Sequence, residues 1–144
     1  MFKTLAAAAA LSLAAFSAAA EGVTHYLAIH VDQADAQVMN MALNNAANVK
    51  SYYESIGDTA IIEVVAYGPG LTMFVEGKSP VADRIATMAL EDENISFAAC
   101  GNTHRAMSAK AGADVALVSE ATIVPSGVVR LMELQEQGYS YVRP

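Results

Sequence analysis

The sequence contains few cysteines and few basic residues. Cys100 is the single cysteine, so no disulfide within the chain can stabilise the fold, which must depend on a hydrophobic core. The 144 residues include 8 Lys and Arg against 15 Asp and Glu, a net charge of −7. So acidic a chain is poorly suited to phosphate backbones and anionic lipid surfaces, and we expect no nucleic-acid partner.

The first twenty residues have the pattern of a secretory signal peptide. Lys3 is the only charge before Glu21, an apolar, alanine-rich stretch covers residues 4–17, and Ala18-Ala19-Ala20 follows it. The apolar stretch is shorter than the roughly 20 residues that span a bilayer, which argues against a permanent anchor. We therefore expect residues 1–20 to be removed between Ala20 and Glu21. The mature chain, residues 21–144, is then a single domain, periplasmic or secreted, with no membrane association.

After residue 21 the hydrophobic pattern alternates between strand and helix. Short apolar runs predict strands at residues 25–31, 60–66, 95–100, 122–124 and 139–142. Between them we predict helices at about 35–55, from Pro80 with Ser79 as cap, from Asn102 or Thr103 to Gly112, and from 125–127 to about Gln137. This alternation predicts an α/β fold of three layers, with a mainly parallel sheet between helices.

In such folds, ligands bind beyond the carboxyl ends of the strands. The residues at those ends are 30–32, 67–70, 100–104 and 125–127. Cys100 ends a strand just before a helix, and the free N–H groups of a helix start stabilise a thiolate. Gly101 would leave room for sulfur beside those groups. The pattern fits an accessible thiol of lowered pKa, and it also fits a buried, inert cysteine.

Other polar residues near these ends have two interpretations each. His104 fits a proton shuttle beside Cys100 or a solvated helix residue, and Arg105 fits a sulfur oxyanion or an exposed position. Residues 101–103 (Gly101, Asn102 and Thr103) and the pair Ser126-Gly127 are candidate anion-binding groups at helix starts, although Ser126 also fits a simple cap.

The sequence gives no indication of a metal or a cofactor. His25 and His30 stand at opposite ends of one predicted strand, too far apart to share a small metal site. Gly68-Pro69-Gly70 lacks the lysine and the glycine spacing of a phosphate loop, and neither a dinucleotide fingerprint nor a G-x-S-x-G elbow occurs.

Several motifs, taken in their order and spacing, resemble those of the DsrE/DsrF-like family, in particular its small exported members. The matching segments cover nearly all of the mature chain. They are His30-Val31, residues 43–48, Glu63–Ala66 with the following Gly68-Pro69-Gly70, Cys100-Gly101-Asn102-Thr103, residues 124–128 and residues 134–144. Tyr67 departs from the pattern, because many relatives have a histidine before that glycine.

The resemblance implies a flavodoxin-like, homo-oligomeric protein of a sulfur relay, in which a cysteine carries sulfur as a persulfide. Cys100 is the only residue that could inherit this role, with His104 as an assisting group, and sulfur donor or acceptor proteins would be its partners. The alternative is a non-catalytic oligomeric module that binds a small ligand or acts as a scaffold, with a structural cysteine. An unpaired edge strand at Tyr139–Val142 and a surface position for Met73–Val75 would both favour self-association.

Overall fold

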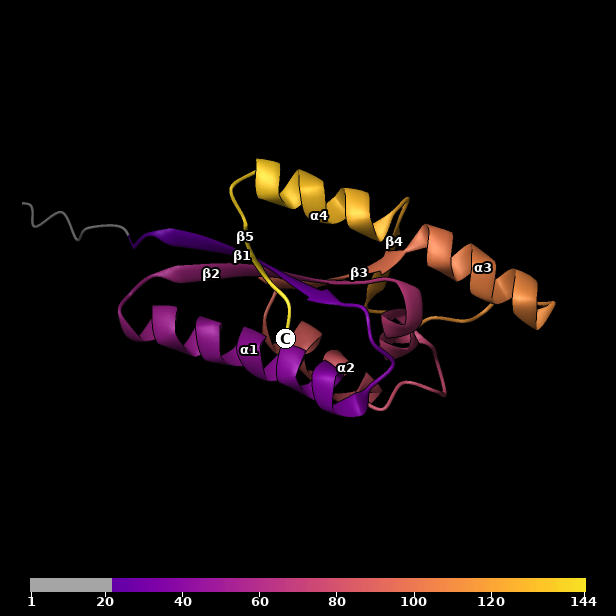
Figure 1. Ribbon diagram of the computed structural model, residues 1–144. Helices are drawn as coiled ribbons and strands as arrows, with labels where there is room; N and C mark the ends of the chain where they lie inside the picture. The colour runs from indigo at the N-terminus through magenta and orange to yellow at the C-terminus, as the bar shows by residue number, and fades with distance from the viewer. Residues whose placement is uncertain (1–21) are drawn as a thin grey trace, which may run out of the picture.

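The computed structural model describes residues 22–144, which form a sheet with helices on both faces (Figure 1). The predicted signal peptide, residues 1–20, lies outside the described residues. The elements in chain order are β1 (Thr24–Val31), α1 (Ala36–Ser55), β2 (Thr59–Ala66), η1 (Gly68–Phe74), α2 (Ala82–Glu91), β3 (Ile95–Cys100), α3 (Gly101–Ala111), β4 (Ala121–Val124), α4 (Gly127–Glu136) and β5 (Ser140–Val142).

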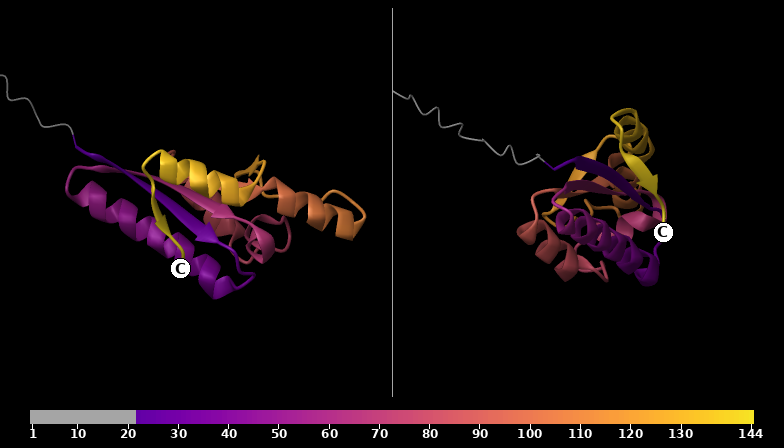
Figure 2. Two further views of the ribbon diagram at one scale, coloured as in Figure 1. Left: turned by 45° about the horizontal axis from the view of Figure 1, so that its top comes forward. Right: turned by 90° about the vertical axis from the view of Figure 1, so that its left-hand side faces the viewer.

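The five strands are all parallel and lie in the order β4-β3-β2-β1-β5. Figures 1 and 2 show α1 and α2 on one face of the sheet and α4 on the other. Right-handed crossovers explain this arrangement: the chain steps in one direction from β1 to β4, then returns through α4 to the far edge of the sheet. The predicted three-layer α/β fold is confirmed, although the strand order differs from that of flavodoxin itself.

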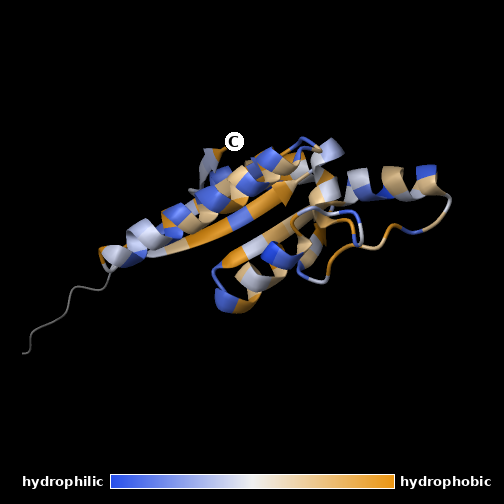
Figure 3. Ribbon diagram, turned by 90° about the horizontal axis from the view of Figure 1, so that it is seen from below, coloured by the Kyte–Doolittle hydropathy of each residue, from blue (hydrophilic) through white to orange (hydrophobic). Residues whose placement is uncertain are grey.

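The main hydrophobic core lies between the sheet and the layer of α1, α2 and η1. The predicted face of α1 supplies Met39, Ala42, Leu43 and Ala46, and Figure 3 shows mostly apolar strands beneath helices of mixed polarity. A smaller core fills the space under α4, where Leu131 and Leu134 pack on Ala28, Val65 and Ala98. Alternate residues of each strand therefore face different cores, as the pleat requires.

Three local predictions are wrong. The helix predicted from Pro80 begins at Ala82, because the Ser79 hydroxyl accepts the Val81 N–H in a preceding turn. α3 begins directly at Gly101, with Cys100 rather than Asn102 or Thr103 at the cap position. Met73, Phe74 and Val75 are buried, so this segment belongs to the core and offers no contact surface.

The other boundaries agree closely with the sequence pattern. Gly112 ends α3 in the left-handed conformation, with φ of 70°, and Gly138 follows α4 with φ of 92°. β5 is an edge strand that pairs with β1 over three residues. No helix within residues 22–144 is both long and apolar enough to cross a membrane.

Candidate functional site

The direction of the chain connections reverses between β3 and β4. The chain leaves β3 towards its neighbour β4, but it leaves β4 towards β5 at the opposite edge. In open parallel sheets this divergence of loops creates the usual ligand site. Cys100 ends β3, Gly127 starts the helix that follows β4, and the two residues lie together at this point.

The Cys100 sulfur faces backbone N–H groups at the starts of α3 and α4, although it makes no capping bond of ordinary geometry within α3. Burial raises the pKa of the Cys100 thiol. Hydrogen bonds from the Thr103 hydroxyl and from the backbone N–H groups of Gly127, Thr103 and Asn102 lower that pKa, and together they outweigh the effect of burial. The result is a pKa below that of an ordinary cysteine. The Thr103 hydroxyl accepts the Gly68 N–H at 2.9 Å, which leaves its own hydrogen free to donate to sulfur.

Cys100 is buried, which contradicts the predicted accessibility: the residue is 4% exposed. The start of α4 covers it. A methyl group added to Gly127 would lie 3.1 Å from the Cys100 Cβ and 3.0 Å from the Tyr67 Cβ. The space beside the thiol therefore depends on Gly127. At Gly101, which we expected to leave that room, an added methyl would instead meet the Val124 carbonyl oxygen at 2.8 Å.

Two tyrosines and a histidine extend the site across the sheet. His30 is the last residue but one of β1, and its ring packs against Tyr67 with centroids 4.4 Å apart. Its Nδ1 lies 2.7 Å from the Tyr141 hydroxyl, on β5. Tyr67 in turn contacts the position of Gly127, next to Cys100. The strand-end rule selected His30 and Tyr67 for inspection, but nothing in the sequence indicated that Tyr141 would join them.

The structure places His104 and Arg105 in other contacts. His104 Nε2 lies 2.7 Å from the Val115 carbonyl, so this side chain ties α3 to the following loop and is not the solvated residue we expected. It is not among the groups that lower the pKa of Cys100. Arg105 is exposed and donates to the Asn102 side chain. Ser126 occupies the cap position of α4, but its side chain makes no capping bond.

An ion pair fixes the first turns of α4 on the sheet. Arg130 donates to both oxygens of Glu63 on β2, with distances of 2.7 and 2.6 Å. The Glu63 side chain is nearly buried, and the hydrogen bond with Glu63 raises the pKa of Arg130, so the guanidinium remains charged. Since the Arg130 N–H also closes the first turn on the Ser126 carbonyl, this pair holds the amide of Gly127 over Cys100.

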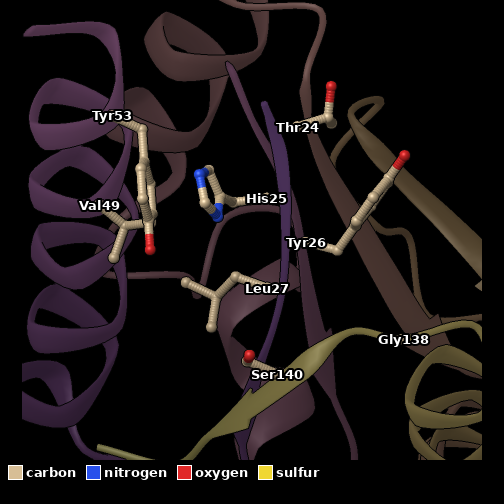
Figure 4. A pocket seen from close by; sticks show the side chains of 8 residues that line it. All are labelled: Thr24, His25, Tyr26, Leu27, Val49, Tyr53, Gly138 and Ser140. Carbon is tan, nitrogen blue, oxygen red and sulfur yellow. The ribbon is translucent and has the colours of Figure 1, made fainter. Parts of the chain in front are cut away.

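A hollow lies at the opposite, amino end of the sheet. It has a volume of about 290 Å³ and lies between α1 and β1, where His25 stacks on Tyr53 with centroids 3.6 Å apart (Figure 4). His25 Nε2 is also 3.0 Å from Asp58. His25 and His30 thus have separate surroundings. Within residues 22–144, no group of three His, Cys, Asp or Glu side chains is placed to hold a metal ion.

Fold and site together define an α/β protein with a buried cysteine of lowered thiol pKa at the topological switch of a parallel sheet. No protein-family model matches the chain, and no curated protein matches it. A solved structure is similar: MTH1491 from Methanobacterium thermoautotrophicum, described as a protein of unknown function. The match has a TM-score of 0.68 and 27% identity, and it covers 83% of this chain and 99% of that one.

Proposed function

We propose that this protein is a sulfur carrier of the DsrE/DsrF-like type, which holds a persulfide on Cys100. The observation that carries the proposal is the set of donors around the sulfur. A structural cysteine in apolar surroundings has a raised pKa, whereas three N–H groups and a hydroxyl lower the pKa of Cys100 despite its burial. The same donors suit the anionic end of a persulfide.

The proposed loading reaction needs no oxidant. The Cys100 thiolate attacks the outer sulfur of a donor persulfide, a new S–S bond forms, and the S–S bond of the donor breaks. The donor leaves as a thiolate with the electron pair, and Cys100 retains the transferred sulfur. Because Cys100 is 4% exposed and the start of α4 is anchored, the Tyr67 side chain has to move for the donor to reach it.

The test combines alkylation rates over a pH series with intact mass after treatment with a persulfide donor. We expect a thiol that reacts in the folded protein, with an inflection below the ordinary cysteine value of about 8.5, and a mass gain of one sulfur. Cys100→Ser controls for the site of loading. Thr103→Val keeps the shape of the side chain but removes the hydroxyl, and it should move the inflection upward. Thr103→Ser keeps the hydroxyl and serves as the matched control.

The competing hypothesis is a non-catalytic oligomeric module that binds a small ligand or acts as a scaffold. The burial of Cys100 favours it, as do the exposed apolar side chains of β4 and α4: Ile123, Val128, Val129 and Met132. If Cys100 reacts only after unfolding and never gains sulfur, the carrier hypothesis fails and this one takes its place.

We also propose export from the cytoplasm, which is supported by the pattern of residues 1–20 alone. Protein recovered from the exported fraction should begin at Glu21. An intact mass that retains residues 1–20 in that fraction would contradict the proposal.

A further inference from the structure

The buried Nε2 atom of His30 has no hydrogen-bond partner. The residue is 4% exposed, and Nε2 is the buried side-chain polar atom of the described chain that has no hydrogen bond. Leaving such a group unpaired costs about 1–3 kcal/mol. Buried polar groups without a partner in a native fold point to an absent ligand, water or ion.

The hydrogen-bonding role of Nε2 follows from the tautomer of His30. Burial lowers the pKa of His30, and Arg143 lowers it further while Asp32 raises it, so the ring is neutral near pH 7. Burial also raises the pKa of Tyr141, so its hydroxyl keeps its proton, and we assign that proton to the bond with Nδ1 rather than the reverse bond from an Nδ1–H. A neutral imidazole that accepts at Nδ1 carries its hydrogen on Nε2. The unpartnered atom is thus an N–H donor, and its ligand must offer an acceptor.

His30 lies on the same side of the sheet as Cys100. Ala28 and Ala98 both face α4, and His30 and Cys100 each follow one of them by two residues. Tyr67 directly follows β2, the strand between them, and it packs on the His30 ring and also reaches the position of Gly127 beside Cys100. The His30 ring, the Tyr67 ring and the start of α4 therefore form one continuous row along the carboxyl edge.

The local field at this edge favours negative charge. α3 and α4 both begin here and direct their positive ends and free N–H groups towards it. The nearby carboxylate of Asp32 is paired with Arg143 at 2.9 Å. An anion therefore meets donors and a neutralised carboxylate, in spite of the acidic composition of the whole chain.

We propose that His30, Tyr67 and Tyr141 form a subsite next to Cys100 for a small anionic sulfur compound, whose acceptor atom binds the His30 Nε2–H. This inference rests on the proposed sulfur-carrier function and adds the class of its low-molecular-weight reactant. Tyr67, which is half-buried, has to swing aside for the compound to enter. Tyr141 is a positioning residue, because it fixes the tautomer that presents the donor.

Binding can be measured without transfer in the Cys100→Ser protein with isotope-labelled histidine. Thiosulfate serves as the probe, and sodium chloride of matched ionic strength as the control. We expect the His30 Nε2 resonance to shift saturably with thiosulfate and not with chloride. An unchanged resonance, or the same shift with chloride, would overturn the inference and leave a buried water as the partner of Nε2.

Two substitutions of His30 separate its two nitrogens. His30→Gln places an N–H near the position of Nε2, whereas His30→Asn keeps an acceptor for Tyr141 near Nδ1 and removes the distal donor. In the Cys100→Ser background, His30→Asn should weaken thiosulfate binding by about ten- to a hundredfold, and His30→Gln by a few-fold at most. Equal affinities for the two variants, or the reverse order, would contradict the subsite.

The result is independent of the test of Cys100. If Cys100 gains sulfur from a persulfide donor while thiosulfate leaves His30 unchanged, the subsite is wrong and the carrier function stands. If thiosulfate shifts the His30 resonance but Cys100 never gains sulfur, the subsite stands as an anion site and the carrier function fails.

Discussion

Gly127, the first residue of α4, lies against Tyr67 after β2 and Cys100 at the end of β3. It has no side chain, and an added methyl would meet the Cβ atoms of Tyr67 and Cys100 at 3.0 and 3.1 Å. These distances are tighter than ordinary contacts, so the neighbours would have to yield. The residue therefore couples the packing of α4 to the chemistry of the thiol.

We predict that Gly127→Ala destabilises the protein and raises the pKa of Cys100. Overpacking costs about 1–3 kcal/mol, and the better helix propensity of alanine offsets up to about 1 kcal/mol of that. The displaced amide would also donate less well to the sulfur. Denaturant unfolding and alkylation over a pH series measure the two effects. Ser126→Ala is the control, because the Ser126 side chain makes no capping bond and its loss should change neither property.

The lowered pKa of His30 predicts that the protein loses stability at acid pH. The pKa of this residue in the folded state is lowered by burial and by Arg143, against the opposing effect of Asp32, with Tyr67 and Tyr141 as the other groups that face it. The unfolded chain therefore binds a proton more readily than the folded one. The contribution is fully present above the unfolded pKa of about 6.5 and is lost as the pH falls through the lower folded pKa.

Urea unfolding at about pH 7.5 and about pH 5 should show this loss in the wild type. His30→Asn should show a smaller loss between the same two pH values, because the titrating ring is gone. An equal loss in both proteins would assign the pH dependence to groups other than His30.

At the scale of the element, α4 is the part of the fold that completes the site. The helix is held by a small apolar cluster and by the Arg130–Glu63 pair, and its first amide reaches the Cys100 sulfur. A helix anchored so close to its first residue presents that amide in a fixed position. The thiolate depends on this anchor as well as on its own neighbours.

We predict that Glu63→Gln loosens this anchor. The substitution keeps the shape but removes the charge opposite Arg130, and it should cost about 2 kcal/mol of unfolding free energy, the range for hydrogen bonds to charged groups. It should also raise the inflection pH of Cys100 alkylation, which a purely structural role of Glu63 would leave unchanged. Glu133→Gln is the matched control, since Glu133 is a more exposed partner of the same arginine and its loss should cost little.

At the scale of the whole molecule, apolar side chains lie in solvent on α4 and at the β4 edge of the sheet. β4 is an edge strand with Ile123 half-exposed, and α4 adds Val128, Val129 and Met132. Unpaired strand edges and apolar surfaces of this kind are usually covered by another chain. A second copy of this chain is the occupant we propose, which preserves the expected homo-oligomer but moves its contact away from Met73–Val75.

Light scattering at micromolar concentration should show an oligomer for the wild type. Met132→Glu places a charge in the proposed contact and should shift the population to monomer. Leu90→Glu is the control: Leu90 is 89% exposed on α2, at the opposite face of the sheet, and its substitution should leave the oligomer intact. A wild type that is monomeric at micromolar concentration, or a Leu90→Glu variant that dissociates equally, would reject this contact.

The sequence by itself determined the order of elements and most of their boundaries. Strand and helix patterns come from residues a few positions apart, such as Met39, Leu43 and Ala46 on one face of α1, and they can be recognised without the fold. The strand-end rule likewise selected Cys100, Gly127, His30 and Tyr67. The local pattern predicted the wrong first residue for α2 and for α3. A turn at Ser79 precedes α2, and Gly101 lies close to Val124 at the start of α3.

Only the tertiary structure decided what these residues touch. The burial of Cys100, the amide of Gly127 above it and the bond between His30 and Tyr141 join segments that are from 27 to 111 positions apart in the chain. Such contacts depend on the strand order and on the face that each helix covers. A local pattern contains neither, because the pleat and the helical repeat act over a few residues, whereas the return of the chain through α4 to β5 is a property of the whole sheet.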